Sequence, residues 1–240
     1  MDKLLVIKGL ASTLPQAQAL IMAGKVIVED HTVDKPKISI PIDAPIRLKD
    51  ADRLYVSRGG IKLQTPLDTF AIDVANKIVL DVGASTGGFT DCLLQRGAQL
   101  VYAVDVGYGQ LAWKLREDPR VVNLERKNIR TMTPQEIAIP PDLAVIDVSF
   151  NSLKKIWPPV IALLKPGGGL LSLIKPQFEV SREAVEEGGV VRDIKKYQEV
   201  IKNMVDEARA LSLHIVGIME SPIRGQDGNR EFFLYTVKHT

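Results

Sequence analysis

The sequence predicts an α/β fold whose sheet is mostly parallel and is covered by helices on both faces. From Ile78 onward, short apolar runs alternate with stretches that have the apolar spacing of amphipathic helices. The runs are nearly continuous in apolar residues, which is typical of strands buried on both faces. The chain has 240 residues, 45% of them hydrophobic, enough for one such domain and a small appendage. We expect residues 54–240 to form the α/β domain and residues 1–53 the appendage.

The appendage has a shorter and more mixed pattern. Helical spacing covers Asp2–Leu10 and Pro15–Ala23, and Gly24 then offers a left-handed C-cap. Alternating patterns predict strands at Lys25–Val28 and Lys37–Ile42. We therefore expect a small α+β unit of two helices and a hairpin, with a thin core.

Seven strands are expected in the larger domain. The first five are the apolar runs Ile78–Val82, Leu100–Asp105, Val121–Leu124, Leu143–Asp147 and Leu170–Lys175. Helical spacing between and after them covers Phe89–Arg96, Leu153–Leu164 and Tyr197–Leu211. The last two runs, Ile215–Met219 and Glu231–Val237, have no helix between them, so they are expected to pair as an antiparallel hairpin. This ending is unlike an ordinary dinucleotide-binding fold and is similar to its methyltransferase variant.

Composition excludes several classes of protein. A disulfide scaffold is excluded because Cys92 is the only cysteine. The longest apolar runs, such as Gly169–Ile174, are far shorter than the ~20 residues that span a bilayer. The first residues lack the pattern of a signal peptide, so a cytoplasmic protein is expected. The net charge of +2 is too small to indicate a nucleic-acid partner by itself.

A glycine-rich loop, Asp81–Phe89, follows the first strand of the larger domain. Glycine lets the backbone approach a ligand closely, and the next helix presents free N–H groups. A dinucleotide site would have glycine where this chain has Ser85. An esterase elbow, G-x-S-x-G, is matched, and Asp147 and His214 follow in the order of that class. However, only one strand of the sheet precedes the serine, which is a poor context for a hydrolase.

The third interpretation of the loop is an S-adenosylmethionine site. Asp81 ends the strand beside the loop, where a carboxylate can meet the cationic end of the ligand directly or through water. Asp105 ends the next strand, where the ribose hydroxyls of an adenosine ligand would lie. Asn128 and Ile129 follow the third strand, beside the expected place of adenine. The expected cofactor-binding residues are Asp81, Gly83, Ala84, Ser85, Thr86, Gly87, Gly88, Phe89, Asp105, Asn128, Ile129 and Asp147.

Four charged residues form a candidate catalytic set. Asp147 and Lys175 end neighbouring strands. In an open parallel sheet, ligands bind and react at the carboxyl ends of the central strands. A partly desolvated lysine needs a partner, and Asp147 can supply it, although a purely structural ion pair would look the same. Lys62 opens the helix before the first strand, and Glu231 begins the last strand. Each of these two would, alone, be read as a surface charge.

The order Lys62, Asp147, Lys175 and Glu231 resembles that of the FtsJ-type RNA ribose 2′-O-methyltransferases. The whole chain resembles the TlyA-type, or haemolysin-like, family, which joins such an enzyme to a ribosomal protein S4-like RNA-binding domain. The stretches that carry this resemblance are Asp2–Val6, Ala23–Val26, Tyr55–Leu63, Asp81–Thr90, Asp147–Phe150, Lys175–Glu179 and Gly188–Asp193. The resemblance implies a Rossmann-like class I methyltransferase domain at residues 54–240 and an RNA-binding domain at residues 1–53. It also implies methylation of ribosomal RNA at a cytidine 2′-hydroxyl, with S-adenosylmethionine as the donor.

The chemistry of such a reaction agrees with the residues. Methyl transfer from a sulfonium needs in-line attack and excluded solvent, and it needs no metal. A sugar hydroxyl is a feeble nucleophile, so a positioned base has to take or weaken its proton. We expect Lys175 to be that base and Asp147 to orient it. Lys62 and Glu231 would position the ribose, and positioning should supply much of the rate.

Basic residues indicate where RNA would lie. The segment Lys114–Arg130 has six basic and three acidic residues, an excess compatible with phosphate contact. The residues expected to contact RNA are Arg58, Lys114, Arg116, Arg182 and Arg192. Residues 1–53 carry eight basic and seven acidic side chains, and Ser12–Pro15 lacks the serine-arginine pair of related domains. This unit is therefore expected to orient a large substrate, such as a ribosomal subunit, rather than to bind RNA tightly alone.

Two other functions remain as alternatives. A membrane-lytic protein is suggested by the haemolysin label, but the chain lacks the amphipathic or apolar segments that this activity needs. A ribosome-binding factor that keeps the fold and the ligand without the activity would have the same pattern. Methyl incorporation into ribosomal RNA distinguishes the enzyme from both.

Overall fold

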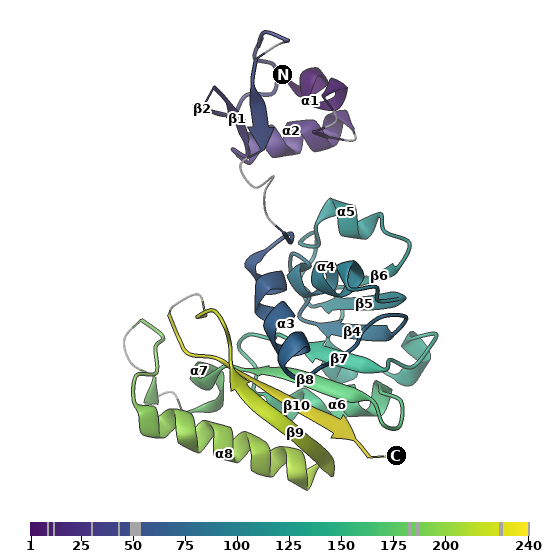
Figure 1. The fold of residues 1–240 in the computed structure, drawn as a ribbon, viewed down its shortest axis with the longest axis vertical. Helices are drawn as coiled ribbons and strands as arrows, with labels where there is room; N and C mark the ends of the chain where they lie inside the picture. The colour runs from purple at the N-terminus through teal and green to yellow at the C-terminus, as the bar shows by residue number, and fades with distance from the viewer. Residues whose placement is uncertain are drawn as a thin grey trace. The chain divides into compact units, whose positions relative to one another are not determined.

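The chain folds into two compact units, Met1–Arg53 and Leu54–Thr240, drawn as ribbons in Figure 1. The computed structural model describes residues 1–8, 10–11, 13–29, 31–42, 44–48, 54–181, 184–185, 188–225 and 228–239, apart from the side chain of Arg47.

The small unit packs two helices against a three-stranded antiparallel sheet. Its elements are α1 (Asp2–Ile7), α2 (Leu14–Met22), β1 (Val26–Val28), β2 (His31–Val33) and β3 (Ile46–Leu48), with the strand order β2-β1-β3. Thr13 caps α2 by accepting a hydrogen bond from the Gln16 backbone N–H at 3.3 Å. Gly24 follows α2 with a φ of +63°, the left-handed conformation expected of it. The small core is centred on Leu5, Ala17, Ile21 and Val26, all fully buried.

The strand predicted at Lys37–Ile42 is wrong. The structure has irregular backbone there, and β1 pairs with β2 and β3 instead. Pro36 precedes the segment and Pro41 lies inside it, and proline has no N–H to donate to a sheet. The period-two pattern of apolar residues therefore has no ladder to join.

The large unit contains a seven-stranded sheet in the order β6-β5-β4-β7-β8-β10-β9. The strands are β4 (Ile78–Val82), β5 (Leu100–Asp105), β6 (Val121–Glu125), β7 (Leu143–Ile146), β8 (Gly169–Ile174), β9 (Leu213–Glu220) and β10 (Phe232–Lys238). The pairings from β6 through β8 are parallel, and β10 lies antiparallel between β8 and β9. The helices are α3 (Arg58–Thr69), α4 (Gly88–Gln95), α5 (Trp113–Arg116), α6 (Trp157–Leu163), α7 (Pro176–Glu179) and α8 (Ile194–Ala210), with 3-10 turns η1 (Ile129–Thr131), η2 (Pro134–Glu136) and η3 (Leu153–Lys155). The expected mostly parallel sheet and its antiparallel ending are confirmed.

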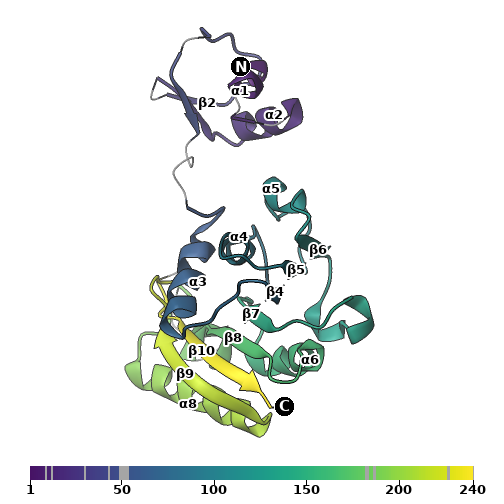
Figure 2. The ribbon, with the colours of Figure 1, turned by 45° about the vertical axis from the view of Figure 1, so that its right-hand side comes forward.

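Helices cover both faces of this sheet, as expected (Figure 2). Alternate residues of the strands pack into two separate cores, one on each side. In β4, Val79 packs with the core under α3 and α4, whereas Leu80 packs with the core under α6 and α8. In β10, Phe233 and Leu234 divide in the same way. This two-sided burial explains why the strands are continuously apolar in sequence.

The helix predicted at Leu153–Leu164 is instead a 3-10 turn, η3, followed by α6. Pro158 and Pro159 occupy the start of α6. Proline is tolerated in the first turn of a helix but not inside it, so the helix begins here rather than four residues earlier.

The longest helix, α8, shows a clear amphipathic pattern. It has 17 residues and buries Tyr197, Val200, Met204 and Ala208, spaced three or four residues apart. Its remaining positions are largely polar. Over the described ranges of the chain, no helix combines the length and apolar character that crossing a membrane requires.

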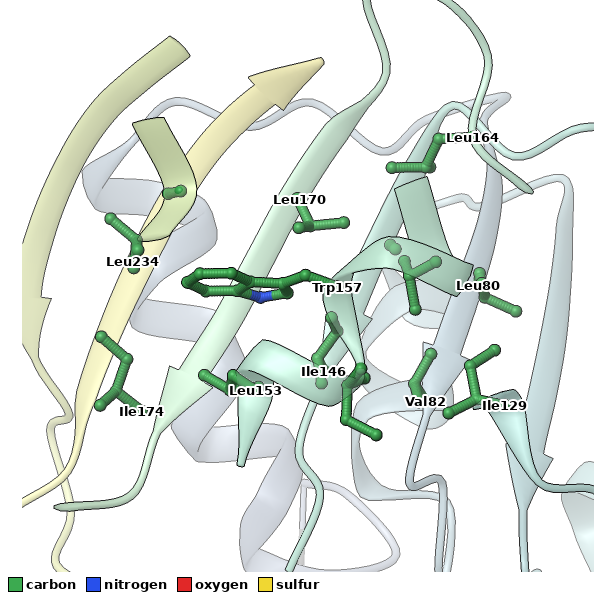
Figure 3. Packing of buried hydrophobic residues seen from close by; sticks show 14 of the residues in the cluster. Leu80, Val82, Ile129, Ile146, Leu153, Trp157, Leu164, Leu170, Ile174 and Leu234 are labelled. Carbon is green, nitrogen blue, oxygen red and sulfur yellow. The ribbon is translucent and has the colours of Figure 1, made fainter. Parts of the chain in front are cut away.

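Trp157 lies at the centre of one core, where its ring is surrounded by residues of α6, β8 and β10 (Figure 3). Its Nε1 donates a hydrogen bond to Ser172 Oγ at 2.9 Å, and both residues are buried. We expect Trp157→Phe to lower the free energy of unfolding by about 2 kcal/mol, because it leaves a void and a buried hydroxyl without its partner. Urea denaturation followed by far-UV circular dichroism measures this, with the exposed Trp113→Phe as the control. An unchanged midpoint for Trp157→Phe would contradict the prediction.

Candidate active site

The carboxyl ends of the central strands open into a cleft of about 600 Å³. It is the place where ligands bind in open α/β sheets. Its lining includes the ends of β4, β7 and β8, the start of α3 and the loop that precedes β10. All four residues of the predicted catalytic set line it: Lys62, Asp147, Lys175 and Glu231.

Asp147 and Lys175 form the ion pair that their strand positions predicted. The Lys175 Nζ lies 2.6 Å from Asp147 Oδ1, and the side chains are 10% and 21% exposed. The same Nζ donates to Ser149 Oγ at 2.9 Å. Lys175 is thus a largely buried side chain that lines the cleft and has one ion-pair partner and one hydrogen-bond acceptor.

Lys62 and Glu231 form a second ion pair, which the sequence did not predict as a contact. Lys62 Nζ donates to Glu231 Oε2 at 2.7 Å, across 169 positions in the chain. The Glu231 side chain is only 3% exposed. A Cβ added to Gly225 would lie 2.6 Å from Glu231 Oε1, so the loop before β10 needs glycine at that point.

The glycine loop forms one wall of the cleft. Its lining members are Gly83, Ala84, Ser85, Thr86, Gly88 and Phe89. Gly83 has a φ of +86°, and a Cβ there would lie 2.4 Å from the backbone oxygen of Asp147. Gly87 caps α4 with a φ of +95° and does not line the cleft. The turn between β4 and α4 therefore depends on two left-handed glycines, and one of them lies against the backbone of Asp147.

Asp81 is fully buried behind this loop. Its Oδ2 accepts a hydrogen bond from Thr90 Oγ1 at 2.6 Å, whereas its Oδ1 has no partner among the described residues. Burial, with smaller contributions from the charges of Asp147 and Asp105, raises the pKa of Asp81 to about 7. A buried carboxylate oxygen without a partner is costly, and a cationic ligand nearby would offset that cost.

The other predicted cofactor residues lie outside the 600 Å³ cleft. Asp105 accepts hydrogen bonds from the backbone N–H groups of Ser85 at 2.8 Å and Gly107 at 2.7 Å, so it ties two loops together. Asn128 caps η1 by accepting from the Arg130 N–H at 3.1 Å. The Ile129 side chain is buried in the core under α6 and α8, so only its backbone is available to a ligand.

The predicted RNA-binding residues differ in their surroundings. Arg58 is exposed and lines the cleft, whereas Lys114 pairs with Asp91 at 2.9 Å. Arg116 is engaged inside the unit: its Nε donates to the Leu111 carbonyl, and its guanidinium holds the pKa of Glu125 at about 2. Arg192 is exposed, and Arg182 lies outside the described residues.

The esterase alternative fails on topology. Ser85 follows the carboxyl end of β4, whereas His214 pairs with Val237 at the level of Gly169, the amino end of β8. The serine and histidine are thus at opposite ends of the sheet, and Asp147 is paired with Lys175 instead. A hydrolytic triad needs the serine within hydrogen-bond distance of the histidine, and the histidine within hydrogen-bond distance of the aspartate.

Several residues that shape the cleft were not singled out by sequence reasoning. Ser149 contacts Lys175, and the exposed Phe150 has a φ of +61° and packs its ring 5.1 Å from that of Phe178. Arg224 lines the opposite wall. Glu179 is largely buried, which raises its pKa above the ordinary value. Only the polar positions just after predicted strand ends offered a signal for Ser149.

The sequence signature of FtsJ-like methyltransferases matches residues 55–238, and that of the S4 domain matches residues 1–40. The chain belongs to the FtsJ-like methyltransferase family. The order of the FtsJ-like sheet and its helix-covered faces, as described above, are those of a class I methyltransferase fold.

Relatives match this FtsJ-like chain over nearly its whole length. A Bacillus subtilis protein provisionally named rRNA methyltransferase YqxC is 49% identical over 236 residues, covering 98% of this chain and 84% of the relative. The 16S/23S rRNA (cytidine-2′-O)-methyltransferase TlyA of Mycobacterium tuberculosis is 45% identical, covering 100% and 90%. A solved structure from Streptococcus thermophilus, provisionally described as a hemolysin, is 42% identical with a TM-score of 0.77 and covers 99% and 87%.

Proposed function

We propose that this protein is an S-adenosylmethionine-dependent methyltransferase that modifies a ribose 2′-hydroxyl of ribosomal RNA, at a cytidine. The observation that carries the proposal is the convergence of Lys62, Asp147, Lys175 and Glu231 on one cleft beside the glycine loop. The similarity to TlyA supports the substrate class and the nucleotide.

The residues beside the cleft fit S-adenosylmethionine. Asp81 has a buried oxygen without a partner among the described residues, which suits a cationic ligand, and Gly83 lets the glycine loop pack directly against the Asp147 backbone at the edge of the cleft. The lining residues Gly83 to Phe89 except Gly87 would hold the methionine end, and Asp105, with Asn128 and the Ile129 backbone, would hold the adenosine. When bound, S-adenosylmethionine would supply an electrophilic methyl group on a sulfonium, and the carbon–sulfur bond that breaks in the transfer would release a neutral thioether.

Lys175 acts as the base in this proposal. Its amine accepts the proton of the ribose hydroxyl as the oxygen attacks the methyl carbon, and the resulting ammonium is stabilised by Asp147 at 2.6 Å. The Lys62–Glu231 pair forms the neighbouring wall and positions the ribose through its remaining hydrogen-bonding atoms. The pairing also keeps the Lys62 charge from being left uncompensated in a partly buried site.

We propose that the two units have different roles, one in methyl transfer and one in orienting the RNA. Residues 54–240 form the methyltransferase domain, and residues 1–53 form an S4-like RNA-binding domain that orients a ribosomal subunit. The compact units Met1–Arg53 and Leu54–Thr240, together with the two family matches, support these boundaries. We propose that phosphates of the RNA contact five basic residues: Arg58 at the cleft, Lys114, Arg116, Arg182 and Arg192. Arg116 is the weakest candidate of these, because its charge is already paired with Glu125. A cytoplasmic location follows from a ribosomal substrate.

The proposal predicts alkali-resistant methylation. Wild-type protein incubated with ribosomal subunits and labelled S-adenosylmethionine should transfer label to RNA. The phosphodiester next to the modified ribose should then resist alkaline cleavage, because its 2′-oxygen can no longer attack. Label on a base, which leaves alkaline cleavage unchanged, would overturn the ribose assignment. Binding of subunits without label transfer would instead favour a ribosome-binding factor that lacks the activity.

A further inference from the structure

The contacts of the Lys175 amine determine the direction in which its lone pair points. In the ion pair Lys175 is an ammonium, and the base of the proposed reaction is the neutral amine that it gives on losing one proton, with two N–H bonds and one lone pair. Nζ lies 2.6 Å from Asp147 Oδ1, an oxygen that accepts no hydrogen bond from a described residue, and it donates a hydrogen bond to Ser149 Oγ at 2.9 Å. Donation of one N–H to Ser149 Oγ fixes the rotation of the amine about its Cε–Nζ bond and therefore the direction of its lone pair, and the Lys175 side chain lines the cleft.

We propose that Ser149 is a positioning residue: its Oγ accepts one N–H of Lys175 and thereby aims the lone pair of the amine at the substrate hydroxyl. This inference rests on the proposed function, in which Lys175 is the base. The contact with Asp147 is an ion pair without a hydrogen bond, so it holds the charge in place but does not set the rotation about the Cε–Nζ bond. The hydrogen bond to Ser149 sets that rotation, and small errors in the position of a reacting group can lower a rate about 100-fold.

The loop that carries Ser149 is held in place at its other end. Glu179 Oε2 accepts from Ser152 Oγ at 2.6 Å, and Glu179 Oε1 accepts from the Leu153 N–H at 2.7 Å. Because Glu179 is only four residues after Lys175, the segment that bears the base also clamps the loop that bears Ser149. The rings of Phe150 and Phe178 pack between these two attachment points. Base and acceptor therefore belong to one doubly anchored unit.

The Ser149 side chain is expected to contribute little to the stability of the fold. The residue is exposed. Removal of its hydroxyl takes one acceptor from Lys175 and leaves the clamp by Glu179 intact. A change in activity without a change in stability is therefore the signature of a positioning role.

The test compares Ser149→Ala with Ser149→Thr, which restores a hydroxyl at the same atom position. With saturating RNA and labelled cofactor, Ser149→Ala should lower kcat by about 10- to 100-fold with a KM for RNA within about threefold of wild type. Ser149→Thr should recover most of the rate. Ser181→Ala is the matched control, because Ser181 is exposed and its hydroxyl makes no hydrogen bond within the described chain. A wild-type kcat for Ser149→Ala, or a loss confined to KM, would overturn the inference.

A second measurement separates this inference from the proposed function. Exchange of the Lys175 side-chain hydrogens with water, followed by ¹⁵N NMR, reports on the hydrogen bond without any substrate. Ser149→Ala should accelerate this exchange, and Ser149→Thr should restore it. Absence of methyl transfer by the wild type would remove the proposed function, whereas unchanged exchange in Ser149→Ala would remove the Ser149–Lys175 contact itself.

Discussion

Lys175→Ala is expected to lower the rate of methyl transfer by about 10²- to 10⁴-fold, the range found when a general base is removed. The ribose hydroxyl then has no group beside it that can accept its proton. Asp147 remains in the cleft, but in the wild type it is the ion-pair partner of the Lys175 amine at 2.6 Å and is not the group that we place against the hydroxyl. Single-turnover transfer of labelled methyl to ribosomal subunits measures the rate directly.

Binding provides the control for this variant. Affinity for the RNA and for the cofactor should change little, since Lys175 acts on a proton rather than on the bulk of either ligand. Lys155→Ala is the matched variant, because Lys155 is exposed and forms no ion pair with a described residue. Equal rates for wild type and Lys175→Ala would exclude Lys175 as the base.

Cofactor binding is expected to depend steeply on pH through Asp81. Burial, assisted by the charges of Asp147 and Asp105, raises the pKa of Asp81 from 3.8 to about 7. Below pH 7 the free protein therefore holds a proton on Asp81, and a cationic cofactor has to displace it. The dissociation constant of S-adenosylmethionine should fall about tenfold for each pH unit from 5 to 7 and then level off.

Calorimetry in buffers of different ionisation enthalpy measures both the affinity and the proton release. Close to one proton should leave per cofactor bound at pH 6. Asp81→Asn should abolish the pH dependence and the release, whereas the exposed Asp34→Asn should leave both unchanged. A dissociation constant that is the same at pH 5.5 and pH 7.5 in the wild type would contradict this account.

The same group affects the stability of the free protein, with a definite sign. The folded state keeps the Asp81 proton at pH values where the unfolded chain has lost it, so the folded state binds more protons between about pH 4 and pH 7. The contribution of Asp81 to the free energy of unfolding therefore falls as the pH rises through this window, by about 4 kcal/mol in total. Asp81→Asn should flatten that decline.

Much of the α/β domain was predictable from local pattern. Strands buried on both faces have to be apolar throughout, and for that reason Ile78–Val82 and Leu100–Asp105 were found with their observed bounds. Prediction failed where proline overrides a periodic pattern, at Lys37–Ile42 and at the start of α6. Those failures arise from missing N–H donors, which hydrophobic spacing does not register.

The candidate site was predictable only to the extent that it follows strand ends. Asp147 and Lys175 end adjacent parallel strands, so their contact follows once the strand order is assumed. Ser149 and Glu179 were missed because their partners are set by the path of loops, and a loop path depends on packing between segments. The same limit applies to Asp81, whose burial and unpartnered oxygen are properties of the folded interior alone.

The residue types, their order and the alternation of strands and helices were determined by the sequence itself, because each depends on apolar spacing within a few residues. The tertiary structure decided which charges meet. Lys62 and Glu231 lie 169 positions apart, and their ion pair exists because β10 inserts antiparallel beside β8 and starts at the edge where the parallel strands end. Sheet order is set by the burial of both faces at once, and no local stretch of the chain contains that information.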